Sequence, residues 1–120
     1  MKRGHRSLKV WQEAMTLVEN VYAATRSFPK EELFGLAAQM RRAAVSVPAN
    51  IAEGSARSGT KELARFVSIA VASLSELDTH IEIARRLGYL SEDRLAQRVD
   101  ALGGLLMGLE RSLKAKTKPA

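Results

Sequence analysis

The 120-residue sequence contains no cysteine. This absence excludes disulfide bonds, thiolate catalysis and zinc sites held by thiolates, and nothing in the chain calls for an oxidising compartment. We therefore expect a cytoplasmic protein. At this length we also expect one domain with one hydrophobic core, which buries about two-thirds of the extended surface without covalent cross-links.

Long apolar runs are also missing. Arginine, lysine or glutamate interrupts every stretch before it reaches the ~18 apolar residues that a membrane-spanning helix needs. The first six residues, Met1 to Arg6, carry positive charge. They are followed by an amphipathic segment from Leu8 to Glu13, whereas a signal peptide would continue with an apolar core. We therefore expect no membrane partner.

The alternation of apolar and polar residues that is typical of half-buried strands is almost absent, and apolar residues instead recur every three or four positions. This spacing predicts an all-α fold of four helices. The short turns between them favour an antiparallel up-and-down four-helix bundle. The expected ordered core spans about residues 8–113 and is flanked by basic flexible termini, within a single domain of residues 1–120.

The first predicted helix, about Leu8 to Arg26, carries two adjacent apolar rows, and Ser7 is its expected N-cap. The rows are Leu8, Trp11, Met15, Val18, Tyr22 and Thr25, and Val10, Ala14, Leu17 and Val21. The second helix begins between Glu31 and Leu36. Its core row keeps its phase across Pro48, which predicts one continuous helix kinked at this proline near Ala44 or Val45. That row is Ala37, Met40, Ala44, Val47 and Ile51.

The third and fourth helices show the heptad spacing of helices that pack along one seam. The seams are Leu63, Val67, Ala70, Leu74, Leu77, Ile81 and Ala84, and Leu95, Val99, Leu102, Leu106, Leu109 and Leu113. We expect Ser58 or Thr60 to cap the third helix and Gly88 to end it. Ser91 is the expected cap of the fourth, with Glu92 and Asp93 in its first turn. In that helix Gly103, Gly104 and Gly108 predict the close approach of another backbone.

A polar row follows the second predicted helix at steps of three and four residues, so its members share one stripe. It consists of Gln39, Arg42, Ser46, Asn50, Glu53 and Arg57. Beside the seam of the third helix lie Glu62, Ser73, Glu76 and His80. The two arginines of the row would then pair with the glutamates between helices. Two interpretations remain open: a solvated face, or a polar network that is buried or lies between subunits and fixes register and partner choice.

Catalytic and cofactor patterns are not found. The glycines of the fourth helix lack the lysine and hydroxyl residue of a nucleotide-binding loop, and no nucleophilic triad is apparent. Glu76 and His80 are spaced by four residues, whereas the Glu-x-x-His pair of di-iron bundles is spaced by three. We therefore expect no enzymatic activity, no cofactor and no metal site.

Basic residues exceed acidic ones by 19 to 13, a formal net charge of +6. This excess permits an acidic partner such as RNA or DNA. Candidate contacts, besides the two termini, are Arg41, Arg42, Arg57, Lys61, Arg65, Arg85 and Arg86. Since aromatic residues are not interleaved with them, we expect salt-dependent phosphate contacts and no base stacking.

Several segments between Leu8 and Leu90 resemble the four-helix bundle proteins related to the 23S rRNA intervening-sequence protein. The most specific is Arg41-Arg42-Ala43-Ala44-Val45-Ser46-Val47-Pro48-Ala49-Asn50-Ile51-Ala52-Glu53-Gly54. Others are Lys9-Val10-Trp11-Gln12-Glu13-Ala14, Phe34-Gly35-Leu36, Phe66-Val67-Ser68-Ile69-Ala70 and Leu87-Gly88-Tyr89-Leu90. The chain departs from the family at Val71-Ala72-Ser73, where a glycine is more usual.

The resemblance implies a bundle that assembles into a ring, typically a homopentamer, without enzymatic activity. Some members are encoded within inserted sequences of ribosomal RNA genes, and distant relatives are basic accessory proteins of diversity-generating retroelements that contact reverse transcriptase and nucleic acid. Our leading hypothesis is a non-catalytic ring-forming bundle that binds RNA or DNA. The alternative is a protein adaptor that docks a partner on the apolar rows of the first helix.

Overall fold

The structure is a computed structural model that describes residues 1–118. It contains four α-helices and two short 3₁₀ helices in this range, and no strand. The elements are η1 (Gly4–Ser7), α1 (Lys9–Thr25), η2 (Lys30–Glu32), α2 (Leu36–Ala56), α3 (Thr60–Arg86) and α4 (Arg94–Thr117). No helix in the described residues combines the length and apolar character that crossing a membrane requires.

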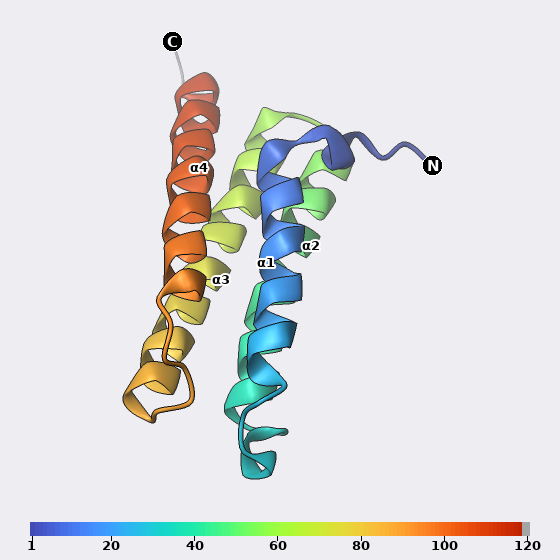
Figure 1. Cartoon of the computed structure of the whole chain (residues 1–120). Helices are drawn as coiled ribbons and strands as arrows, with labels where there is room; N and C mark the ends of the chain where they lie inside the picture. Colours follow the sequence, from blue (N-terminus) through green and yellow to red (C-terminus); the bar gives the residue numbers. More distant parts are fainter. Residues whose placement is uncertain (119–120) are drawn as a thin grey trace.

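Consecutive helices run in opposite directions, and the N-terminus and α4's C-terminal end lie at the same end of the bundle (Figure 1). Each helix packs against two neighbours, in the cycle α1–α2–α3–α4, with the most extensive contact between α2 and α3 and the least between α1 and α4. The prediction of an all-α, antiparallel up-and-down four-helix bundle is confirmed.

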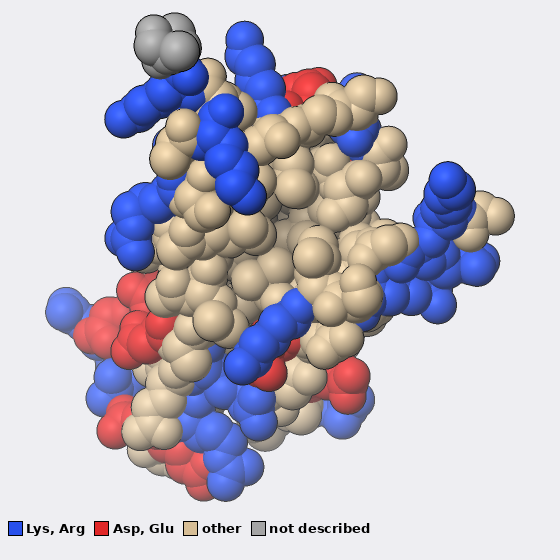
Figure 2. All heavy atoms as spheres, turned by 90° about the horizontal axis from the view of Figure 1, so that it is seen from above, with Lys and Arg blue, Asp and Glu red and all other residues tan. Residues whose placement is uncertain are grey.

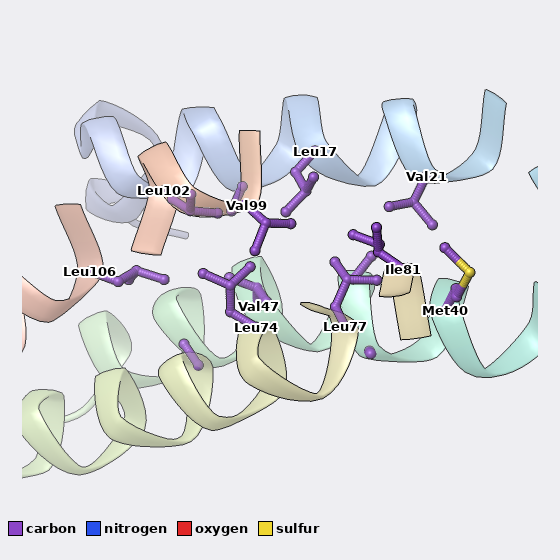
Figure 3. Close-up of a cluster of buried hydrophobic side chains, with 14 of the residues drawn as sticks. Leu17, Val21, Met40, Val47, Leu74, Leu77, Ile81, Val99, Leu102 and Leu106 are labelled. Atoms are coloured by element: carbon purple, nitrogen blue, oxygen red, sulfur yellow. The ribbon is translucent and has the colours of Figure 1, made fainter. Parts of the chain in front are cut away.

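The core lies along the bundle axis, where apolar side chains from all four helices point toward one another (Figure 3). The predicted rows of α2, α3 and α4 are buried in it, apart from the half-buried Leu63 and Leu109. In α1 the buried row is Val10, Ala14, Leu17 and Val21, whereas Met15 and Tyr22 of the other row are exposed. The rows lie about 100° apart on the helix. The row from Val10 to Val21 faces the core directly, whereas Leu8, Trp11 and Val18 of the other row are half-buried against its edge.

Helix α2 continues through Pro48 as one helix, as predicted, while the kink itself stays a prediction. The preserved phase of the apolar row explains the continuity. Val47, Pro48 and Ile51 are buried, so packing against the core offsets the loss of one backbone hydrogen bond at the proline. Helix α4 extends to Thr117, four residues beyond its predicted end, and Pro119 and Ala120 of the predicted flexible tail lie outside the described residues.

The predicted serine and threonine caps are wrong. Side-chain cap hydrogen bonds are absent from all four α-helices. Ser7 donates to the carbonyl of Gly4 within η1, and Leu8 occupies the cap position of α1. The cap position of α3 is Gly59 at φ +90°, a conformation that glycine adopts without steric strain. It allows the tight reversal between α2 and α3.

The prediction for the C-terminal end of α3 is correct, whereas the prediction for the start of α4 is wrong. Gly88 at φ +80° follows α3 as the expected helix stop. Glu92 and Asp93 precede α4 and do not lie in its first turn, which contains no acid. Since the loop extends to Asp93, Ser91 lies too early to cap the helix.

The close approach of two helices occurs at a glycine of α2, whereas the prediction placed it at the glycines of α4. A Cβ on Gly104 or Gly108 would meet nothing within 4 Å in the described chain, and one on Gly103 would lie 3.7 Å from a Leu74 methyl carbon. A Cβ on Gly54, by contrast, would lie 2.7 Å from Phe66 Cβ and 3.2 Å from Leu63 Cδ1. Gly54 therefore sets the distance between α2 and α3 near their connecting turn.

We predict that Gly54→Ala lowers the free energy of unfolding by about 1–3 kcal/mol, because the added methyl forces α2 from α3. Gly104→Ala is the matched control, expected to raise it by up to about 1 kcal/mol through helix propensity alone. Urea unfolding at one protein concentration measures both. A Gly54→Ala variant as stable as the parent would contradict the close approach.

Candidate functional site

Three members of the predicted polar set meet between α2 and α3. The hydroxyls of Ser46 and Ser73 lie 2.8 Å apart, joining the two helices. The amide nitrogen of Asn50 donates to the Ser46 carbonyl at 2.8 Å and to its hydroxyl at 2.9 Å. All three side chains are half-buried. This serine–asparagine cluster is a polar link between α2 and α3, formed by the hydrogen bond between the two serines.

The charged members of the set do not form the predicted pairs between helices. Arg57 pairs with Glu53 at 3.4 Å within α2, and Glu62 pairs with Arg65 at 3.0 Å within α3. These partners are three or four residues apart in sequence, so they are already neighbours on the helix surface. Arg42 and Glu76 are exposed and make no ion pair with any described residue.

The same side of the molecule exposes apolar residues. Val45 is 42% exposed, Ile69 38% and Ile83 42%. We call the surface around them the α2–α3 outer face. It comprises Gln39, Arg42, Val45, Ala49, Ile69, Ala72, Glu76 and Ile83, all exposed. His80 lies beside this face but is buried, and its Nδ1 has no hydrogen-bond partner among the described residues.

Charge is distributed unevenly along the bundle axis. The half that holds both termini comprises residues 1–17, 47–73 and 106–118, divided from the rest near the middle of each helix. It carries eleven of the 19 lysines and arginines but four of the 13 acids, a net charge of +7. The other half carries eight basic and nine acidic residues, a net charge of −1. The whole positive excess therefore lies at one end.

We call this charged region the basic end. It consists of Lys2, Arg3, Arg6, Lys9, Arg57, Lys61, Arg65, Arg111, Lys114, Lys116 and Lys118. Figure 2 looks onto it and shows lysine and arginine side chains around a centre of uncharged residues, including those of the N-terminal arm at the right. Its members come from three separate segments of the chain, which the antiparallel topology brings together.

The predicted nucleic-acid contacts divide between the two halves. Arg57, Lys61 and Arg65 belong to the basic end, whereas Arg41, Arg42, Arg85 and Arg86 lie in the other half. Of those four, Arg41 donates to the Thr25 hydroxyl at 2.9 Å. Arg85 reaches Asp93 at 3.1 Å, and Arg86 reaches Glu82 at 2.9 Å.

The hydrogen bond from Arg86, opposed in part by desolvation, lowers the pKa of Glu82, and the charges of Arg86 and Arg85 lower it further.

Two arginines of the basic end are held against an aromatic ring. The guanidinium carbons of Arg57 and Arg65 lie 5.3 and 4.5 Å from the centre of the Phe66 ring. Phe66 itself is buried against Gly54, so its ring is not available for a nucleobase. The arginines are thus oriented by packing, and the exposed chemistry of this end is cationic.

The described residues contain no group of three or more histidine or acidic side chains that could hold a metal ion.

We predict that Ser46→Ala and Ser73→Ala each lower the free energy of unfolding by about 1 kcal/mol, since each leaves a half-buried hydroxyl without its partner. The double variant should cost less than the sum of the two, with a coupling of about 0.5–1 kcal/mol in a double-mutant cycle. Additive effects would contradict a link between the helices at this point.

The comparisons with known proteins agree with the observed fold. A family model described as 23S rRNA-intervening sequence protein matches residues 6–108, which covers most of the chain and all but the end of α4. No curated protein matches the sequence significantly. The matched region includes the polar row, Pro48 and Gly54. The chain belongs to the 23S rRNA-intervening sequence protein family.

Proposed function

We propose that this protein is a non-catalytic nucleic-acid-binding protein that contacts phosphates through its basic end. The observation that carries the proposal is the segregation of charge, with a net +7 in one half of the bundle and −1 in the other. A concentrated positive field attracts a polyanion more strongly than the same charge spread over the surface, since fields beyond about 10 Å are screened at physiological salt.

Most of these cations are free to meet phosphate. Arg57, Arg65 and Lys114 have carboxylate partners within 4 Å, and the other eight make no ion pair with a described residue. All are exposed, and lysines on helix ends bind phosphate as point charges. Since the buried Phe66 offers no stacking surface, recognition should depend on charge and shape and show little base preference.

The family description concerns an intervening sequence of 23S rRNA, which makes structured RNA the first ligand to test. The cysteine-free composition agrees with a cytoplasmic location, which we propose for this binding.

We predict that replacing Lys61, Arg111 and Lys116 together by glutamine weakens binding to structured RNA and reduces the salt dependence, by about one unit of slope per lost contact. The matched control is Arg26→Gln with Lys30→Gln and Arg86→Gln, which removes equal charge from the other half and should leave affinity nearly unchanged. Mobility shifts between about 50 and 200 mM salt measure both.

Two results would contradict this function. One is the absence of any retarded complex with structured RNA or with single- or double-stranded DNA even near 50 mM salt. The other is an equal loss of affinity in both triple variants, which would show that the total charge matters and its position does not.

We also propose that copies of the chain assemble into a ring, as a homopentamer, through the α2–α3 outer face. This face combines exposed Val45, Ile69 and Ile83 with Arg42 and Glu76, two opposite charges that lack ion-pair partners within the described chain. A second copy would bury the apolar side chains and supply those partners. In a cyclic ring each subunit uses two different patches, so the face would meet a different surface of the next subunit.

We predict that Val45→Glu with Ile69→Glu dissociates the assembly, because two charges would be buried at the contact without partners. Both side chains are exposed in the single chain, so helicity measured by circular dichroism should be retained. Met107→Glu, an exposed substitution on α4, is the control and should leave the assembly intact.

Light scattering with size-exclusion chromatography decides this prediction. A parent protein that is monomeric at micromolar concentration would contradict the ring. An assembly that survives both glutamates would contradict the choice of face.

The alternative function is that of a protein adaptor or accessory subunit without nucleic-acid binding. Its support is the apolar row of α1 that begins at Leu8, in which Met15 and Tyr22 are each 38% exposed. Pull-down from nuclease-treated lysate distinguishes the two functions, because a partner held through RNA is lost while one docked on α1 is retained.

A further inference from the structure

A cavity of about 360 Å³ lies at the end of the bundle opposite the basic end. It is formed by the last turns of α1, the α3–α4 loop and the first turns of α4. Its volume falls at the lower end of the range of about 300–1,000 Å³ that is typical of small-molecule sites. The proposed function makes no use of this region.

One wall of the cavity carries an unused hydrogen-bond donor. The amide nitrogen of Asn20 is enclosed and has no hydrogen-bond partner among the described residues. Buried polar atoms in folded proteins are nearly always paired, so an unpaired one indicates room for a water molecule or a ligand atom beside it. Ser91, whose side chain makes no hydrogen bond to a described residue, also lines the cavity.

Two arginines line the cavity from α4. Arg94 and Arg98 are four residues apart, so they extend from the same side of the helix. Neither forms an ion pair with any described residue, although acidic residues lie close by in the sequence. Asp93 is engaged by Arg85 at 3.1 Å, and Glu32 accepts hydrogen bonds from the Tyr89 hydroxyl and the Leu36 amide.

The remaining surface of the cavity combines apolar and polar groups. Ala24, Leu90 and Leu95 line it beside the ring of Tyr89, while Glu92 contributes an acid. Burial raises the pKa of Tyr89, as do its hydrogen bond to Glu32 and the negative charges of Glu32 and Glu31. The phenol therefore stays neutral at physiological pH and keeps Glu32 engaged.

We propose that this cavity binds a phosphomonoester on a small, partly apolar body, of the size of a mononucleotide. The planar guanidinium groups of Arg94 and Arg98 match the oxygens of a phosphate, and arginine binds such groups through paired hydrogen bonds. Leu90 and Leu95 accommodate the nucleoside beside Asn20. Glu92 repels a second anionic group and favours a monoester with a single phosphate.

Isothermal titration of the full chain with adenosine monophosphate, adenosine and inorganic phosphate tests this site. We expect the monophosphate to bind saturably and adenosine not to bind. Arg94→Gln with Arg98→Gln should weaken the monophosphate at least about tenfold, since two charge-assisted contacts are lost. Arg26→Gln with Lys30→Gln removes equal charge from the same half without touching the cavity, and should bind as the parent does.

The result that overturns the proposal is either no saturable binding of the monophosphate at about 10 mM or an equal affinity in the Arg94/Arg98 double variant. Inorganic phosphate that binds as tightly as the monophosphate would overturn the role of the apolar wall.

A second titration identifies the source of the phosphate. A short RNA with a 5′-phosphate is compared with the same RNA bearing a 5′-hydroxyl. If the 5′-phosphate raises the affinity for the RNA and this increase disappears in the Arg94/Arg98 variant, the ligand is an RNA end. If only the free mononucleotide binds, the ligand is a metabolite. The Lys61/Arg111/Lys116 variant leaves the cavity untouched. A negative result for the cavity is therefore distinguishable from a negative result for nucleic-acid binding at the basic end.

Discussion

The packing of α2 on α3 is the contact on which the rest of the structure depends. At the connecting turn Gly54 allows the backbone of α2 to approach Phe66, and midway along the helices Ser46 and Ser73 join them by a hydrogen bond. Gly59 at φ +90° then reverses the chain within a few residues. A wider separation would leave the turn strained and the serines unpaired.

This hairpin also determines where charge accumulates. Because α2 and α3 turn beside the N-terminus and the end of α4, the cations of three separate segments meet at one end. A net charge of +6, moderate for a whole chain, becomes +7 in one half and −1 in the other. The long side of α2 and α3 stays free for a second copy, so the proposed self-assembly and the proposed polyanion binding would use separate surfaces.

Features that depend on local spacing in the sequence were predicted well, whereas features that depend on contacts between distant segments were not. The seams of α2, α3 and α4 were predictable because heptad spacing directly encodes the buried side of a helix. In α1 two rows compete, and only the placement of α2 and α4 decides that Leu17 is buried and Met15 exposed. The expected pairing of Arg57 with α3 failed because Glu53, one helical turn away, is a nearer partner. Gly54 and the cavity at Asn20 depend on tertiary distances that no local pattern contains.

The proposed contact of nucleic acid with the basic end can be mapped directly through the lysines. Six of the seven lysines belong to that end, and Lys30 is the seventh. Chemical cross-linking of the protein to structured RNA, followed by mass spectrometry of the linked peptides, reports which lysines lie at the phosphates. We predict cross-links at Lys61, Lys116 and the other lysines of the basic end, and none at Lys30. Cross-links at Lys30 as frequent as those at the basic end would contradict it.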